Sequence, residues 1–254
     1  MKEVLYTIPM NDAMNAEDEC PFCFIERNIE QDQLDFVLGS GASYMEADIR
    51  ALTDAEGFCR THMKAMFNYG NALGNGWILK TYYAKLKTEL ANQMKKYQPG
   101  KTSLKDMLIK PKGEVSYANS VAAFLDKYEN SCYICKREEE MYDRYLNTFF
   151  VMFKDEEFRN RVKNSKGFCL SHFKDLCEYA EKKESEAIKK SFFEIAFELM
   201  NNNMDRLYED VSWLIEKYDY RNNDADWKNS KDAIQRGMQK LKGGYPADPP
   251  YKRS

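Results

Sequence analysis

Apolar residues recur along the chain with the spacing of amphipathic helices. Large apolar side chains over 79–97 fall three or four positions apart and share one helix face: Leu79, Tyr82, Tyr83, Leu86, Leu90, Met94 and Tyr97. A second apolar stripe over 192–218 predicts a long helix, in which Asn201–Asn203 is the natural place for a break. The alternation typical of strands bounded by turns is not evident. The pattern predicts an all-α fold.

Proline and glycine divide this helical pattern at one place. Between Phe22 and Tyr245 the only prolines are Pro99 and Pro111, and Gly100 and Gly113 lie beside them. We therefore expect a first helical half over 1–100, a linker over 101–113, a second helical half over 114–244 and an extended tail over 245–254. The second half would end in a short amphipathic helix closed by Gly243-Gly244.

The cysteines and histidines form a sequence motif that occurs twice in the chain. The first copy is Cys20-Pro-Phe-Cys23 followed by Gly57-Phe58-Cys59-Arg-Thr-His62. The second copy is Cys132-Tyr-Ile-Cys135 followed by Gly167-Phe168-Cys169-Leu-Ser-His172. The chain has seven cysteines and only two histidines, and this pattern uses both histidines at equivalent places. The repeat predicts a duplicated helical bundle with one site in each half.

The residue types in each copy fit a closed metal site. A CxxC turn brings two thiolates together, and a Cys-x-x-His pair on the first turn of a helix adds a thiolate and an imidazole. The resulting Cys₃His set is typical of structural zinc, and its four protein ligands leave no position for a catalytic water. We therefore expect two Zn²⁺ ions, with iron–sulfur clusters as the alternative.

The same motifs predict the local structure around the ligands. Short helices are expected around 45–53 and 155–163, each followed by a GFC turn that opens the next helix. Gly57 and Gly167 would permit the tight turn. In this scheme, the metal pins the start of one helix against the start of another within the same half.

Charge and hydropathy argue against a nucleic-acid-binding protein and against a membrane-spanning protein. The chain has 254 residues and a formal net charge of −3, whereas general nucleic-acid binders are strongly basic. The longest apolar run, Phe149–Phe153, is too short for a transmembrane helix, and the N-terminus has no apolar stretch of signal-peptide length. We expect a cytoplasmic protein with a protein partner and no membrane or nucleic-acid partner. A reducing compartment also disfavours disulfides.

Two further features stand outside the repeat. Cys177 follows His172 by five residues, and we interpret it as a packed thiol, with a redox or alternative-ligand role as the other interpretation. The polar stretch 216–232 contains Asp219, Arg221 and Trp227. These residues form either a cluster that docks the C-terminal helix or a ligand site in which Arg221 holds an anion and Trp227 stacks.

The tandem motifs, together with Lys217-Tyr-Asp219-Tyr-Arg221 … Trp227, resemble an uncharacterised bacterial family of helical proteins with tandem CxxC…GFCxxH metal-binding halves. The resemblance covers nearly the whole chain, implies metal sites on the eight residues already named and supplies no activity. Our favoured hypothesis is a metal-braced scaffold or interaction protein, because no histidine remains for acid–base chemistry. The alternatives are a redox or metal-responsive protein and an enzyme with a pocket between the halves.

Overall fold

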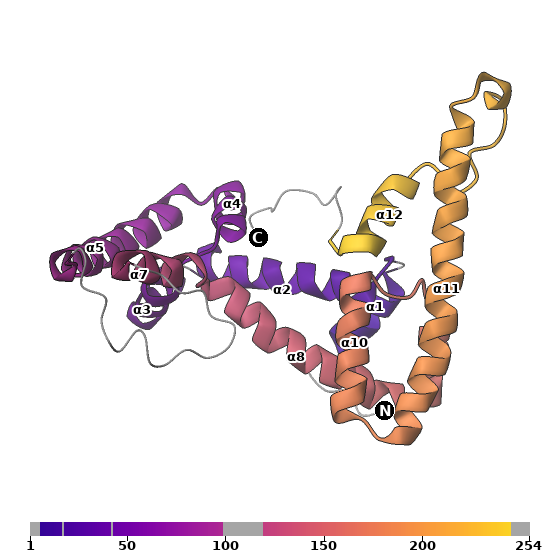
Figure 1. Ribbon diagram of the computed structural model, residues 1–254, viewed down its shortest axis with the longest axis horizontal. Coiled ribbons are helices and arrows are strands. Elements are labelled where there is room, and N and C mark those ends of the chain that lie inside the picture. Colours follow the sequence, from indigo (N-terminus) through magenta and orange to yellow (C-terminus); the bar gives the residue numbers. More distant parts are fainter. Residues whose placement is uncertain (1–5, 17, 42, 99–118, 245–254) are drawn as a thin grey trace. The chain divides into compact units, whose positions relative to one another are not determined.

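The computed structural model describes residues 6–16, 18–41, 43–98 and 119–244 (Figure 1). Within these ranges every regular element is an α- or 3-10 helix, which confirms the all-α prediction. The expected linker over 101–113 and the expected tail over 245–254 lie outside the described residues. Among the described helices, none is long and apolar enough to cross a membrane.

The described chain forms two compact units that differ from the sequential halves expected over 1–100 and 114–244. Among the described residues, unit 1 combines those up to Glu30 with those over 138–244, and unit 2 holds those within Gln31–Arg137. The division falls inside two helices, α2 (Pro21–Leu38) and α8 (Tyr133–Phe153), so each of these helices belongs to both units.

Unit 1 is organised around an aromatic core. Besides its parts of α2 and α8 it contains α1 (Thr7–Asn15), α9 (Glu156–Lys163), α10 (Leu170–Lys183), α11 (Glu186–Lys217), η2 (Tyr220–Asn222) and α12 (Ala233–Lys242). Phe149 is fully buried, with six phenylalanine rings whose centroids lie 5.3–6.3 Å from its own. The apolar run Phe149–Phe153 therefore serves the core except at Val151, which is exposed, and burial of each phenylalanine ring stabilises the fold by about 2–3 kcal/mol.

Unit 2 has a smaller core. It contains η1 (Ser43–Met45), α3 (Ala47–Glu56), α4 (Arg60–Tyr69), α5 (Ala72–Lys96) and α7 (Ser120–Glu129), together with the end of α2 and the first turn of α8. Leu34 and Leu38 of α2 pack with Tyr69 of α4 and Tyr133 of α8. The helix expected over 79–97 is the C-terminal part of α5.

The two glycine turns are built as the sequence predicts. Gly57 ends α3 with a φ of 62°, and Gly167 follows α9 with a φ of 78°. Two residues later, Cys59 and Cys169 are the N-cap residues of α4 and α10. The positive φ favours glycine because an L side chain is strained there, and the turn places a thiol at each helix start.

Helix α11 is continuous, so the break suggested at Asn201–Asn203 is wrong. The side chain of Asn203 is buried, donates to the Leu199 carbonyl oxygen at 2.9 Å and accepts from Arg206 Nε at 3.0 Å. Both of these partners of the Asn203 side chain lie within one turn of the same helix, so these bonds are made with the helix intact.

Helix α12 packs on unit 1 through its polar side. Figure 1 shows it beside α11. Gln239 and Lys240 are 2% and 1% exposed, whereas Ile234, Met238 and Leu241 are 46–54% exposed. Arg236 on the same helix bonds Asp210 of α11 at 2.9 Å. The helix is therefore held by ion pairs and hydrogen bonds more than by its apolar residues.

Candidate metal centres

The eight residues of the repeated pattern converge in two groups of four. Site 1 consists of Cys20, Cys23, Cys169 and His172, and site 2 consists of Cys59, His62, Cys132 and Cys135. Within each group, one ligand atom from every residue lies within 4.8 Å of the others. Each site lies inside one compact unit, site 1 in unit 1 and site 2 in unit 2.

The pairing of the motifs corrects the expectation that each sequential half holds its own site. Site 1 joins the CxxC of the first copy to the Cys-x-x-His of the second copy, and site 2 joins the remaining two motifs. The sites therefore connect segments far apart in the sequence, such as Cys20 and His172.

Aromatic residues inside the motifs give the physical reason for this exchange. Phe22, between the two cysteines of site 1, packs against Phe168 of the GFC turn, with ring centroids 6.3 Å apart. In site 2, Tyr133 packs against Phe58 at 6.2 Å, and its backbone N–H donates to the Gly57 carbonyl oxygen at 2.9 Å. Burial of these rings brings each CxxC to the GFC turn of the other copy.

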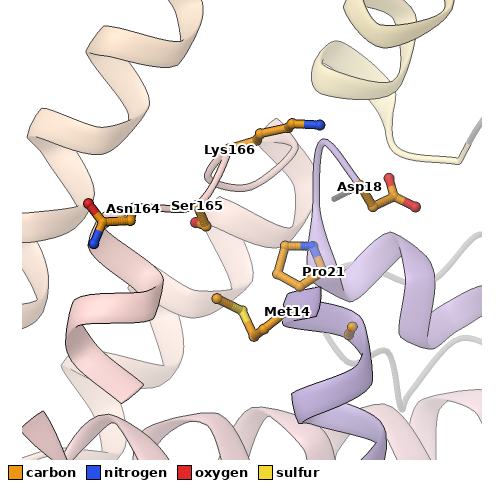
Figure 2. A pocket seen from close by; sticks show the side chains of 7 residues that line it. Met14, Asp18, Pro21, Asn164, Ser165 and Lys166 are labelled. Carbon is orange, nitrogen blue, oxygen red and sulfur yellow. The ribbon is translucent and has the colours of Figure 1, made fainter. Parts of the chain in front are cut away.

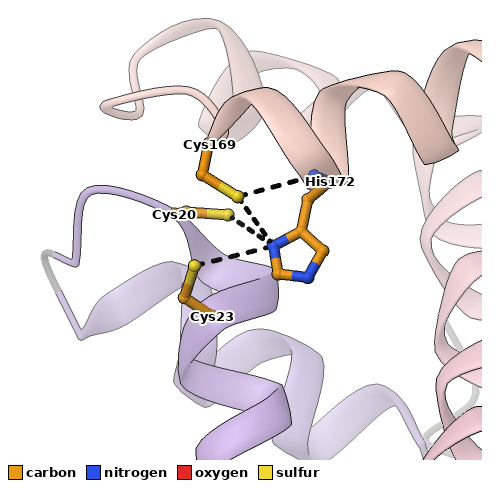
Figure 3. Close-up of side chains that lie close together, drawn as sticks. All are labelled: Cys20, Cys23, Cys169 and His172. Carbon is orange, nitrogen blue, oxygen red and sulfur yellow. Dashed lines mark hydrogen bonds between the residues drawn. The ribbon is translucent and has the colours of Figure 1, made fainter. Parts of the chain in front are cut away.

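Site 1 is fully buried, and Figure 3 shows its four side chains pointing toward one another. His172 Nδ1 faces three sulfurs, with Cys169 Sγ at 3.1 Å, Cys20 Sγ at 3.3 Å and Cys23 Sγ at 3.6 Å. The exposed fractions of all four residues are 2% or less. The rings of Phe22 and Tyr142 lie 5.7 and 5.4 Å from the imidazole centroid.

The other imidazole nitrogen of His172 bonds a carboxylate. Nε2 lies 2.9 Å from Glu26 Oε1, one helical turn beyond Cys23 on α2. An Nε2–H that donates to Glu26 leaves the Nδ1 lone pair directed at the sulfurs. Carboxylates in this position orient histidine ligands and raise their basicity toward a metal.

Helix α12 covers site 1 and joins the two segments that carry its ligands. Lys240 Nζ donates to the carbonyl oxygen of Glu19 at 2.7 Å and to that of Lys166 at 2.6 Å. Glu19 directly precedes Cys20, and Lys166 lies three residues before Cys169. Burial lowers the pKa of Lys240, although the nearby Glu19 carboxylate, 3.4 Å away, opposes this shift.

The end of α12 also closes the space above the sulfurs. A Cβ atom at Gly243 would lie 3.5 Å from Cys169 Sγ and 3.8 Å from Cys23 Sγ. The backbone of Gly243 therefore approaches the ligands closely, and its φ of 75° suits glycine. Sequence reasoning interpreted Gly243 as a helix cap and did not identify Lys240 or Glu19, since isolated charged residues carry no spacing signal.

Site 2 has nearly the same distances between its ligand atoms as site 1, but two of its cysteines are more exposed. His62 Nδ1 lies 3.3 Å from each of the three sulfurs, and Cys59 Sγ lies 3.7 Å from Cys135 Sγ. His62 and Cys132 are buried, Cys59 is half-buried and Cys135 is exposed. Glu56, next to the GFC turn, pairs with Lys136 and Arg137 at 2.7 and 3.1 Å.

Protons and metal compete for both ligand sets. Burial, followed by hydrogen bonds from the neighbouring thiols, raises the pKa of Cys20. Burial opposes the imidazolium of His172, but hydrogen bonds with Cys169, Cys23 and Glu26 outweigh it and raise its pKa to about 12. In site 2, burial and the Cys132 thiolate raise the pKa of Cys135 to about 12. A bound metal ion must therefore displace protons from these groups.

The ligand spacing fits a single tetrahedral ion. Zinc bonds of about 2.3 Å to sulfur and about 2.0 Å to nitrogen place tetrahedral ligand atoms about 3.5–3.8 Å apart. The sulfur–nitrogen distances of 3.1–3.6 Å and the sulfur–sulfur distance of 3.7 Å are close to these values. The two clusters could therefore each hold one metal ion.

A family described as a family of unknown function, DUF6062, matches residues 1–248. The chain belongs to DUF6062. This confirms the expectation of an uncharacterised family. No curated protein and no solved structure matches the chain.

The remaining candidate residues of this DUF6062 chain make contacts within their own segment. Asp219 caps η2 and pairs with Arg221, whose side chain is 74% exposed. Trp227 stacks on Lys217, with Nζ 5.0 Å from the ring centroid, and Lys217 donates to three carbonyl oxygens of residues 222–225. These contacts stabilise the turn after α11. Docking of α12 relies on Arg236 and Lys240 instead.

Cys177 lies in α10, half-buried against the core of unit 1, and burial raises the pKa of its thiol. None of the four-residue clusters includes it.

A small hollow beside site 1 is the other notable feature of this DUF6062 chain. Figure 2 shows Met14, Asp18, Pro21, Ser165 and Lys166 among its lining residues. Its volume is about 260 Å³, and none of the eight cysteine and histidine residues lines it. It contains no nucleophile–base pair that would indicate catalysis.

Proposed function

We propose that the chain is a zinc protein in which two structural Cys₃His sites brace a helical scaffold that binds other proteins. The observation that carries the proposal is the convergence of three sulfurs on one imidazole nitrogen in each site. Four protein ligands fill a tetrahedral zinc ion, so the metal would brace the fold and would not activate water. The chemistry of a bound zinc ion here is to neutralise the thiolates and fix their positions.

The compactness of the sites favours zinc over iron–sulfur clusters. In a cluster the thiolates bind different iron atoms and are spread around an inorganic core. Here the four ligand atoms of each site lie within 4.8 Å of one another, which suits a single ion.

An interaction role is supported by what lies outside the sites. Both histidines belong to the clusters, so neither remains for acid–base catalysis. Tyr208, Tyr218 and Tyr220, at the C-terminal end of α11 and beyond, are 75–81% exposed. Exposed aromatic residues are enriched where proteins bind one another. We place the protein in the cytoplasm, where its thiols remain reduced.

Elemental analysis with an absorption spectrum, on protein purified without oxygen, tests the proposal. We expect two zinc ions per chain and no visible colour. Replacement of zinc by Co²⁺ should give the intense visible bands of tetrahedral thiolate coordination. Iron with inorganic sulfide and a brown colour, or the absence of bound metal, would contradict it.

A further inference from the structure

The two sites differ in how far their sulfurs are accessible. In site 1, Cys20 and Cys169 are 0% exposed and Cys23 is 1% exposed. In site 2, Cys135 is exposed and Cys59 is half-buried. Thiolate chemistry requires access of the reagent to sulfur, so the same ligand set should react at different rates in the two units.

The two accessible sulfurs of site 2 are also neighbours. Cys59 Sγ and Cys135 Sγ lie 3.7 Å apart, on the N-cap of α4 and in the first turn of α8. A disulfide needs the sulfurs at about 2.0 Å, so a shift of less than 2 Å at the two side chains would join them. The third cysteine of the site, Cys132, is 8% exposed.

We propose that Cys59 and Cys135 form an oxidative modification site, at which hydrogen peroxide converts the zinc-bound thiolates to a disulfide and releases the zinc ion of site 2. The proposal rests on the proposed function, since it concerns the reactivity of one of the two zinc sites. Site 1, enclosed by α12, keeps its metal under the same conditions.

The chemistry is balanced in two steps. The Cys135 thiolate attacks hydrogen peroxide, so the O–O bond breaks, a sulfenic acid forms and hydroxide leaves. The Cys59 thiolate then attacks this sulfur, forms the S–S bond and expels a second hydroxide. Two electrons pass from the sulfurs to peroxide. Cys132 and His62 remain as ligands, too few for a closed zinc site.

The release of zinc would loosen the contact between two segments of unit 2. Site 2 ties the turn before α4 to the start of α8, where the Tyr133 N–H also bonds the Gly57 carbonyl oxygen. Loss of the ion removes the binding free energy that holds these segments together. The response would therefore be local to unit 2 and reversible by a thiol reductant.

The test uses the full-length zinc-loaded chain in hydrogen peroxide, with a chromogenic zinc chelator as the probe. Zinc is counted first, and a chain without zinc overturns both the proposed function and this inference. With two zinc ions bound, we expect the first to be released at least about tenfold faster than the second, because access governs attack by a thiolate. Peptide mass spectrometry should find a Cys59–Cys135 disulfide that dithiothreitol reverses.

Release of both ions at one rate, release of neither, or a disulfide at other cysteines overturns the inference while the zinc count still supports the proposed function. The variant Cys135→His keeps four ligands without the exposed thiol and should retain both ions in peroxide. Its matched control, Cys23→His in site 1, should still lose one ion. If either variant fails to fold, the disulfide in the wild-type chain decides the question.

Discussion

Sites 1 and 2 have the same ligand set and similar inner distances, yet they differ in their surroundings. Site 1 has two aromatic rings beside its histidine and the end of α12 over its sulfurs. Site 2 leaves Cys135 exposed. The two sites thus share a ligand set, whereas the elements that cover each site determine how accessible its sulfurs are.

The largest expected effect is the loss of a ligand. His172→Ala should remove zinc from site 1 and unfold unit 1, because a structural zinc site contributes on the order of 10 kcal/mol, comparable to the stability of a whole domain. Thermal melting with zinc analysis measures this effect. The control Cys177→Ser, on the same helix, should cost about 1–2 kcal/mol. Similar melting of the two variants would show that His172 is not a ligand.

A smaller loss is expected where α12 covers site 1. Lys240→Met should destabilise unit 1 by about 3 kcal/mol, since it removes the hydrogen bonds to the Glu19 and Lys166 carbonyl oxygens and one of the three cations that surround the buried Glu19 carboxylate. Chemical denaturation measures the change. The control Lys242→Met, at an exposed position on the same helix, should change stability by less than about 0.5 kcal/mol. Equal effects would contradict a bridging role for Lys240.

The two glycine turns allow a matched comparison of the units. A Cβ at Gly57 would lie 2.7 Å from the Tyr82 hydroxyl, whereas one at Gly167 would lie 3.3 Å from the sulfur of Met200. Both backbones have positive φ, so Gly167→Ala should cost about 1–2 kcal/mol and Gly57→Ala about 2–3 kcal/mol. Unfolding free energies in the reverse order would contradict this packing.

The smallest expected effect concerns the Glu26 carboxylate that bonds His172 of site 1. Glu26→Ala should lower the zinc affinity of site 1 by about tenfold and leave site 2 unchanged, because the carboxylate orients His172. Competition with a chelator of known affinity measures both sites. Glu26→Gln, which can still accept from Nε2, should recover part of the loss. An unchanged affinity in Glu26→Ala would show that the contact does not tune the metal.

Local features of the molecule could be predicted from the sequence, and long-range ones could not. The turns at Gly57 and Gly167 and the helices that follow them depend on nearby residues, and they form as predicted. The choice between the two possible pairings of motifs depends on contacts such as Phe22 with Phe168. The spacing of the cysteines is nearly the same in both copies, so it carries no information about that choice.

The packing of α12 over site 1 could not be predicted from the sequence for a similar reason. Lys240 and Glu19 are ordinary charged residues in the sequence, and only the packing of α12 makes them buried partners. The cluster expected from Asp219, Arg221 and Trp227 instead stabilises its own turn. Charge pairs between remote segments leave no periodic signal in one sequence.

The exchanged pairing of the two proposed zinc sites is tested most directly by the zinc content of two double variants after dialysis against a competing chelator. Cys20→Ser with Cys169→Ser removes two ligands from site 1 alone, so one zinc ion per chain should remain. Cys20→Ser with Cys59→Ser removes one ligand from each site, so neither should retain its ion. The reverse result, one ion with Cys20 and Cys59 replaced and none with Cys20 and Cys169 replaced, would contradict the account.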